Sequence, residues 1–430
     1  MKHLLYIPLI SLCCILTSCS DEESFSIPTY DTYRRSVVVY LAAQNSLGDI
    51  GASRLDSAEI VRGASKLTDP HDNVFLFIDD MKKPRLYRIC RYRNNTFYPK
   101  VLAWSTDLCS SDPATLRDLL KYVSTNYPSE SYGLVMWSHA DGWLMADNTQ
   151  NTLGNINKSF GMDVGPDGDP QTDTDASGNI GASMNISDMA DAIALSGVHL
   201  DYIFFDACLM QCVEAAYELR NVTNYIVASA TSTSAYGGYY ENLIPNALFA
   251  YPATDENIAL ISQQYYYDAV ENPDLKSKYN NTGNAISTIK TQYLEQLAQA
   301  TAQYISPLFA EKMTPSLDDI QMYMNSRIFN APNYYDMGSA AHKLLPEEDY
   351  QNWLSIAGKC VIDHHVSNSY IIGYINGMPV ENTLFDPDHV LGVSMFLPQK
   401  KYNSYPYDPF NTQFKKTSWY RDAGWEVTGW

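Results

Sequence analysis

Positive charge is scarce in this chain. Its 430 residues contain 29 Lys and Arg against 49 Asp and Glu, which gives a formal net charge of −20. An acidic surface repels phosphate backbones and anionic lipid headgroups, so this balance argues against nucleic-acid partners and against electrostatic docking on a membrane. Hydrophobic residues make up 45% of the chain, enough for a large core or for two packed domains.

The apolar run at the N-terminus, residues 4–16, is too short to span a bilayer and is typical of the central part of a signal peptide. The tetrapeptide Leu-Thr-Ser-Cys that ends at Cys19 resembles the bacterial lipobox, in which the cysteine becomes the lipidated first residue of the mature protein. The acidic residues 20–23 are similar to the export tag of Bacteroidetes surface lipoproteins. We therefore expect a signal peptide over 1–18 and a polar tether over 19–35. The protein would lie at the outer membrane or cell surface, held only by the lipid on Cys19; an ordinary secretory signal is the alternative.

A zinc-binding cysteine pattern is absent. Five cysteines follow the expected lipidation site Cys19, and their spacing fits no known zinc motif. Because an odd number of cysteines outside the cytoplasm leaves at least one unpaired, we expect a free and possibly reactive thiol. The five positions are Cys90, Cys109, Cys208, Cys212 and Cys360.

Internal repeats and clear linkers after residue 35 are also lacking. Instead, short continuous apolar runs alternate with helical patterns, which predicts a mostly parallel sheet with helices on both faces. The expected strands of the first half are 37–42, 74–78, 132–137, 201–205 and 225–229, and the expected helices are 54–67, 113–127, 186–195 and 209–219. In the second half we expect helices near 255–271, 291–306 and 347–362, and strands near 284–289, 370–375 and 391–397.

Two expected strands end in residues with catalytic chemistry. His139 follows strand 132–137, and Asp206 and Cys208 follow strand 201–205. Working groups of parallel sheets gather at the carboxyl ends of strands, and a thiol at a helix start has a lowered pKa. The pattern therefore indicates a thiolate with a histidine partner. The alternatives are an inert buried cysteine and an aspartate that only caps the next helix.

Two segments resemble the signatures of one family. "YGLVMWSHADGW" (132–143) and "LDYIFFDACLMQCVEAAYELRNVTNYIVAS" (200–229) look like the two characteristic segments of the clostripain family of cysteine peptidases. That family belongs to the caspase, gingipain and legumain clan. Thinner matches lie at 37–49, 159–163, 334–338 and 391–398, so the resemblance covers most of the mature chain.

The resemblance implies roles for individual residues. Cys208 would be the nucleophile and His139 the base and acid, a dyad without a third member. The amides of Cys208 and Ala140 would hold the oxyanion. Asp206 would bind an Arg or Lys side chain, with Thr231 and Thr233 as candidates for the pocket wall.

The resemblance also implies a fold and an activity. We expect a caspase-like α/β sandwich of three layers, with a catalytic core over 36–250 and a C-terminal part over 251–430 that packs on it or continues it. The expected activity is an extracytoplasmic endopeptidase that cuts peptides or proteins after Arg or Lys, as a monomer. The alternative is an inactive or weakly active surface lipoprotein that binds peptides or glycans. Ala140 stands where the family usually has Gly, and would misplace the oxyanion amide if that position needs a positive φ.

Cofactor and processing expectations concern the stretch between His139 and Cys208. Five aspartates lie within 163–179, and relatives can depend on calcium, but their spacing does not match an EF-hand. We expect no required cofactor or metal, with calcium as the alternative to a solvated acidic loop. Lys158 is the only basic residue between the two dyad positions, which makes it a candidate self-cleavage site or simply a surface lysine.

Overall fold

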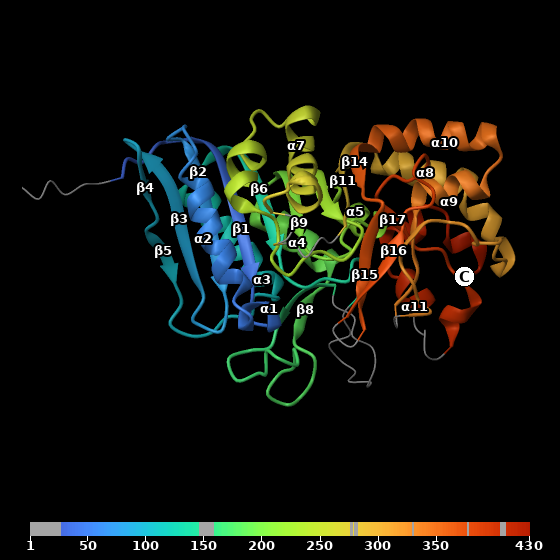
Figure 1. Cartoon of the computed structure of the whole chain (residues 1–430), viewed down its shortest axis with the longest axis horizontal. Coiled ribbons are helices and arrows are strands. Elements are labelled where there is room, and N and C mark those ends of the chain that lie inside the picture. Colours follow the sequence, from blue (N-terminus) through green and yellow to red (C-terminus); the bar gives the residue numbers. More distant parts are fainter. Residues whose placement is uncertain are drawn as a thin grey trace, which may run out of the picture.

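The computed structural model describes residues 27–145, 159–275, 278, 283–328, 331–375, 378–404 and 410–430. A ten-stranded sheet runs through the centre, in the order β14-β11-β10-β9-β6-β1-β2-β3-β4, with β5 paired to β3 (Figure 1). The five strands in the middle of this order are parallel to one another, and the outer strands on both sides are antiparallel. The mostly parallel sheet predicted from the alternating pattern is confirmed.

The strands of this sheet are short, and the central ones are buried on both faces. Their bounds are β1 Tyr33–Ala42, β2 Asp72–Asp79, β3 Arg85–Tyr92, β4 Asn95–Phe97, β5 Lys100–Ala103, β6 Ser129–Trp137, β9 Leu200–Asp206, β10 Thr223–Ser229, β11 Ala285–Lys290 and β14 Val361–Val366. The first strand begins inside the segment expected to be a tether. The last two strands come from the C-terminal part, which therefore continues the sheet of the core.

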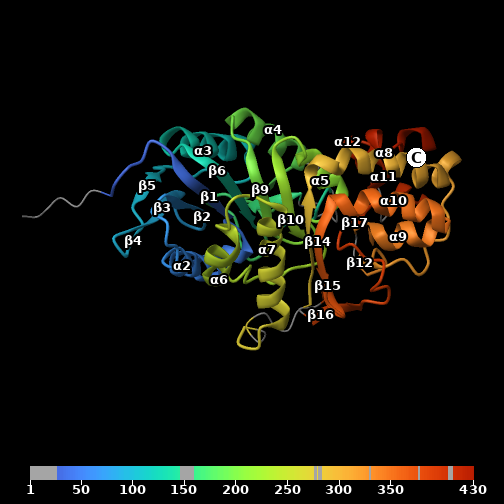
Figure 2. The same ribbon diagram turned by 90° about the horizontal axis from the view of Figure 1, so that it is seen from above.

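Helices cover both faces of the sheet, which gives the three layers of a caspase-like sandwich (Figure 2). Helices α3, α4 and α5 pack on one face together with the C-terminal helices. On the other face lie α2, α6 and α7. Their bounds are α2 Ala52–Ala64, α3 Pro113–Asn126, α4 Ile186–Ser196, α5 Val213–Leu219, α6 Tyr240–Leu243 and α7 Asp255–Tyr266.

The C-terminal part adds helices and small sheets beside the core. Its helices are α8 Leu294–Tyr304, α9 Met337–Leu344, α10 Glu347–Cys360, α11 Phe410–Phe414 and α12 Ser418–Asp422. Its small sheets consist of β12 Met322–Met324, β13 Tyr334–Asp336 and β17 Ser394–Met395, and of β15 Ser369–Ile375 with β16 Met378–Thr383. The strand expected over 391–397 is thus only two residues long. Trp353, Trp419 and Trp425 are fully buried, so this part shares the core rather than forming an appendage.

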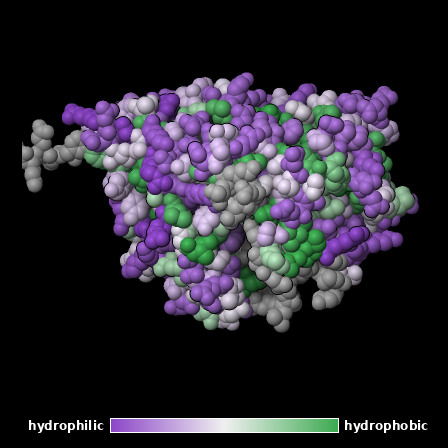
Figure 3. All heavy atoms as spheres, viewed as in Figure 1, coloured by the Kyte–Doolittle hydropathy of each residue, from purple (hydrophilic) through white to green (hydrophobic). Residues whose placement is uncertain are grey.

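Helix α1 and the two-stranded sheet of β7 and β8 lie outside the ten-stranded sheet. Helix α1 is Ser46–Asp49, and β7 (Phe160–Asp163) pairs with β8 (Ala182–Met184) below the sheet in the view of Figure 1. Polar residues predominate on the face seen in Figure 3, with apolar residues in separate patches. Among the described residues, no helix has the length and apolar character needed to cross a membrane.

Candidate active site

The site is built at the ends of two adjacent parallel strands. In the pairing of β6 with β9, Trp137 lies opposite Asp206, the last residue of its strand. His139 and Cys208 each follow two residues later, so the chain leaves both strands at the same level. Because the carboxyl ends of parallel strands meet at one edge of the sheet, the histidine and the cysteine both leave the sheet at that edge.

Cys208 lies in a turn and not at the start of a helix. Helix α5 begins at Val213, whereas a start at residue 209 was expected. Leu209 has a φ of +60°, and its N–H donates to Thr231 O of the neighbouring strand segment at 3.1 Å. The prediction that a helix dipole lowers the pKa of this thiol is therefore wrong: burial raises the pKa of Cys208 above its ordinary value.

The turn after β10 contacts the thiol directly. Thr233 N–H donates to Cys208 Sγ at 3.3 Å, and the Thr233 hydroxyl lies 3.6 Å from the same sulfur. Thr231 is fully buried, and its hydroxyl lies 3.0 Å from Ser229 Oγ and accepts from Ala285 N–H. Of the two threonines, Thr233 thus lines the space around the sulfur, while Thr231 acts through its carbonyl on Leu209.

His139 is held by two residues that the sequence did not single out. Its Nε2 lies 2.9 Å from Ser46 Oγ and 3.7 Å from Asp173 Oδ2. The Ser46 hydroxyl donates to Asp173 Oδ2 at 3.2 Å, so its oxygen is left to accept from the Nε2–H of the histidine. Ser46 begins helix α1 and Asp173 lies in the loop between β7 and β8, and nothing in their local sequence signals this contact.

The two expected oxyanion amides, of Ala140 and Cys208, have suitable backbone conformations. Ala140 does not have a positive φ; in this loop the left-handed residue is Gly142, with a φ of +69°. The alanine is therefore tolerated without strain. Within the described residues, neither amide donates to a backbone carbonyl or a side chain.

Asp206 is a buried carboxylate with one engaged oxygen. Its Oδ2 accepts from Gly238 N–H and from the Tyr240 hydroxyl, each at 2.7 Å. Its Oδ1 is buried and has no hydrogen-bond partner among the described residues. Burial raises the pKa of this carboxyl to about 6. Because α5 begins seven residues later, Asp206 is not the cap of that helix.

More acidic groups surround this carboxylate from helix α2. A Cβ on Gly237 would lie 2.6 Å from Asp206 Oδ2, 2.8 Å from Trp137 Nε1 and 3.1 Å from Asp56 Oδ2, so a glycine keeps this small space open. Asp56 is fully buried, and burial, then the charge of Asp206, raises its pKa well above the ordinary value. On the same helix Glu59 forms an ion pair with Lys278. The surroundings of Asp206 are thus acidic and already attract an ammonium group of this chain.

The carboxylates of the acidic segment 163–179 accept hydrogen bonds, some within the segment and some from distant residues. Asp163 accepts from Ser110 N–H at 2.6 Å, Asp169 from Gln171 N–H at 2.9 Å, and Asp175 from Ser177 N–H at 2.8 Å. Asp173 accepts from Ser46 N–H at 2.8 Å. The alternative of a calcium site here stays a prediction.

Two predicted positions lie outside the described residues. They are Cys19, the expected lipidation site, and Lys158, the expected self-cleavage site. The five cysteines that follow Cys19 are unpaired. The free thiol predicted from the odd cysteine count is therefore confirmed.

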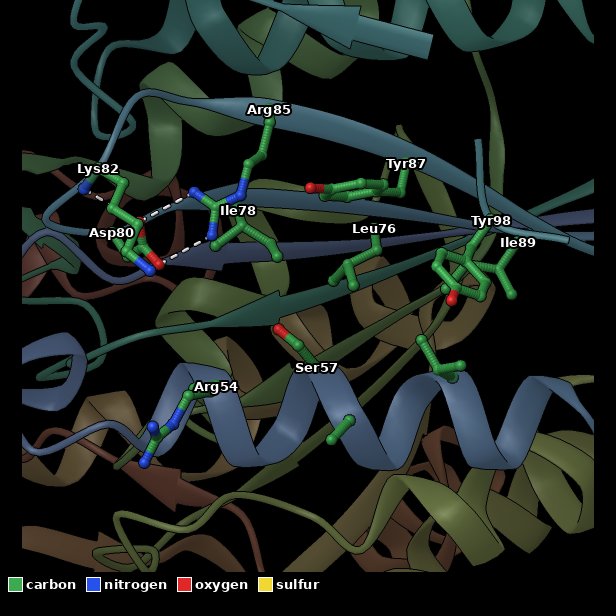
Figure 4. A pocket seen from close by; sticks show the side chains of 12 residues that line it. Arg54, Ser57, Leu76, Ile78, Asp80, Lys82, Arg85, Tyr87, Ile89 and Tyr98 are labelled. Atoms are coloured by element: carbon green, nitrogen blue, oxygen red, sulfur yellow. Dashed lines mark hydrogen bonds and ion pairs between the residues drawn. The ribbon is translucent and has the colours of Figure 1, made fainter. Parts of the chain in front are cut away.

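A separate cavity of about 310 Å³ lies between α2 and the sheet edge formed by β2 and β3 (Figure 4). Leu76, Ile78 and Ile89 form its apolar wall, and the ion pair of Arg85 with Asp80 lies at one end. The cavity contains none of the predicted site residues.

Comparisons with known proteins identify relatives along nearly the whole chain. The model of the clostripain family matches residues 39–430. A secreted C11 cysteine protease from Bacteroides thetaiotaomicron, solved with an irreversible peptide inhibitor, is 24% identical, with a TM-score of 0.73 over 91% of this chain and 99% of its own. An inactive zymogen C11 protease from Parabacteroides distasonis is also 24% identical, with a TM-score of 0.70 over 93% of this chain and 99% of its own. No curated protein matches the chain.

Proposed function

Because this chain belongs to the clostripain family and is a cysteine peptidase, we propose that it cuts peptide bonds after Arg and Lys with Cys208 as nucleophile and His139 as proton carrier. The observation that carries this proposal is the register of β6 and β9, which brings both residues out of the sheet at one level. Family membership favours this activity over a lipoprotein that only binds peptides or glycans.

The first step transfers the thiol proton to the histidine. Burial raises the pKa of Cys208, so the sulfur is a thiol before substrate binds. With the Nε2–H of His139 donating to Ser46 Oγ, Nδ1 is the ring atom that accepts this proton. The sulfur then attacks the peptide carbonyl carbon, and the amides of Cys208 and Ala140 donate to the oxyanion.

The second step breaks the peptide bond. His139 returns its proton to the leaving amine as the carbon–nitrogen bond breaks, which leaves a thioester on Cys208. Water, deprotonated by the same imidazole, hydrolyses the thioester and restores the thiol. Asp173, 3.7 Å from Nε2, favours the imidazolium that forms during both steps and orients the ring through Ser46.

Selectivity for a basic side chain is assigned to Asp206. Its Oδ1 has no partner among the described residues, and the carboxyl groups of Asp56 and Glu59, the latter paired with Lys278, lie on the neighbouring helix α2. A guanidinium or ammonium group entering beside Gly237 supplies the donor that this oxygen lacks. Thr233 lies on the same side, next to the sulfur.

We infer the cellular location from the sequence of the N-terminal segment. The protein acts outside the cytoplasm as a monomer, lipid-anchored through Cys19, on peptide or protein substrates. A similar protease from Bacteroides thetaiotaomicron was solved with a peptide inhibitor, which supports a peptide-cleaving role.

The test is hydrolysis of Arg- and Lys-containing reporter peptides by wild type, Cys208→Ala and His139→Ala. Each change is expected to lower kcat/KM by at least about 10⁴-fold, because it removes a group that makes or carries a bond in the reaction. Cys109→Ala, which removes another half-buried thiol, is the matched control and is expected to keep full activity. Thermal melting of all variants checks the fold, and substantial activity in Cys208→Ala would refute the assignment.

A further inference from the structure

A second cluster of titratable side chains lies in the C-terminal part, away from the candidate active site. His342 comes from α9, and Asp386 and His389 come from the loop between β16 and β17. One nitrogen or oxygen from each of the three lies within 4.8 Å of the others, and all three are half-buried. We propose that these side chains bind a zinc ion.

The aspartate and the second histidine already form a tight pair. His389 Nδ1 lies 2.6 Å from Asp386 Oδ1, with one proton between them. Zinc bonds to imidazole nitrogen and to carboxylate oxygen are each about 2.0–2.2 Å long, so modest separation of these two atoms accommodates the ion. Binding would replace that proton by the metal and release it to solvent.

The two imidazoles are stacked in an arrangement that rings avoid on their own. The centroids of His342 and His389 lie 3.4 Å apart at an interplanar angle of 6°. Aromatic rings prefer offset or edge-to-face contacts over a direct face-to-face sandwich. Turning the His342 ring out of this stack would direct one of its nitrogens toward the Asp386–His389 pair and would relieve the face-to-face contact.

The backbone fixes both halves of the site. A Cβ on Gly338 would lie 2.3 Å from His389 O, so a glycine on α9 permits the close approach of the loop. Asp336, which caps α9, also accepts from Leu391 N–H at 3.0 Å and from Gly392 N–H at 2.9 Å. Little backbone ordering therefore remains to oppose metal binding.

The ligand set favours zinc over calcium or magnesium. Two imidazoles and one carboxylate suit a borderline cation, whereas calcium and magnesium prefer oxygen ligands alone. Water would complete a tetrahedral site. The ion would fasten α9 to the loop that leads to β17, where Ser394 N–H donates to Gln211 O, three residues after Cys208. Zinc would thus stabilise the support of the active-site turn.

Isothermal titration calorimetry with zinc chloride tests the proposal. The starting protein is metal-stripped Cys208→Ala, because the thiol beside His139 would compete for zinc. We expect one zinc per chain and a higher melting temperature. Adding His342→Ala or Asp386→Asn to this variant should weaken zinc binding by more than about 100-fold, because each change removes a direct ligand. Losing a residue that only hydrogen-bonds a ligand costs about 10- to 100-fold.

His71→Ala is the matched control, because His71 pairs with Asp69 and contacts no second imidazole among the described residues. It is expected to leave zinc binding unchanged. The melting temperature of each metal-free variant separates loss of a ligand from loss of fold. Zinc affinity that His342→Ala and Asp386→Asn leave unchanged, or no zinc binding by the starting protein, would overturn the proposal.

Discussion

Asp206, two residues before the candidate nucleophile, and Asp336, at the start of α9, are both buried carboxylates, but their hydrogen-bond partners differ. Burial raises the pKa of each to about 6. Asp336 accepts from Gly338 N–H and Ser339 N–H on one oxygen and from the Tyr323 hydroxyl on the other. Both oxygens are therefore engaged even without its contacts to the loop before β17.

Asp206 differs because its donors converge on one oxygen. Gly238 N–H and the Tyr240 hydroxyl both donate to Oδ2, while Oδ1 has no partner among the described residues. Leaving a buried acceptor unpaired costs about 1–3 kcal/mol. A carboxylate that is fully engaged serves the architecture, whereas one with an open oxygen in an acidic surrounding is poised for a cationic ligand. Burial and pKa alone do not separate these two roles.

Asp206→Asn gives the largest effect that we expect from this comparison. Asparagine retains an oxygen for Gly238 and Tyr240 and places its amide at the open position, so the fold is expected to lose less than about 1 kcal/mol. The preference for Arg and Lys over neutral residues should fall by about 2–5 kcal/mol, because a buried charge pair with substrate is lost. The ratio of kcat/KM for a basic peptide to that for a matched neutral peptide measures this preference. If Asp206→Asn left the ratio unchanged, Asp206 would not determine the specificity.

Asp336→Asn is expected to have the opposite profile. Both carboxylate oxygens of Asp336 accept hydrogen bonds from backbone N–H groups, and in asparagine one of these oxygens becomes an NH2 group that faces a donor. The free energy of unfolding should therefore fall by about 2–3 kcal/mol. The side-chain preference of the remaining folded enzyme should stay that of wild type. Urea unfolding together with the same peptide pairs tests this, and a shift in preference without a loss of stability would contradict the comparison.

The pH dependence gives a smaller effect with a defined sign. Each pKa is raised from 3.8 to about 6, so between these values the folded state binds more protons than the unfolded state. The contribution of each group to stability is thus full below pH 4 and is lost as pH rises to 6. The preference for basic residues instead increases as pH rises, because only the ionised carboxylate of Asp206 attracts a cation.

At pH 5 we therefore expect the preference for basic residues to be about tenfold weaker than at pH 7. Peptide pairs assayed across this range provide the measurement. Asp206→Asn should give a flat profile, and Asp336→Asn should keep the wild-type slope. If the preference of Asp206→Asn for basic residues still changed with pH, the titrating group would be another residue.

The sequence predicted the central sheet well, because strands such as 74–78 and 201–205 are buried on both faces and appear as continuous apolar runs. It failed at residues 209–212, where an apolar helical pattern is overridden by bonds to the end of β10 and the turn after it: Leu209 N–H donates to Thr231 O, and Gln211 N–H to Ser229 O. Local patterns do not record such contacts.

The surroundings of the dyad were only partly predictable. His139 and Cys208 stand out because they follow strands, and Asp206 because it shares the face of Cys208. Ser46, at the start of α1, and Asp173, in a loop, reach His139 from 93 and 34 residues away along the chain, and their polar neighbours are typical of any turn. Contacts of this kind follow from the packing of loops, which single-sequence periodicity does not determine.

Covalent labelling tests the central claim most directly, that Cys208 attacks the bond and Asp206 beside it reads a basic side chain. A peptide with Lys next to an electrophilic ketone is compared with the same peptide carrying norleucine, and the modified cysteine is identified by mass spectrometry. We predict an adduct on Cys208, formed at least about 30-fold faster with the Lys peptide, and near-equal rates in Asp206→Asn. An adduct on another cysteine, or equal rates for both peptides with wild type, would contradict the account.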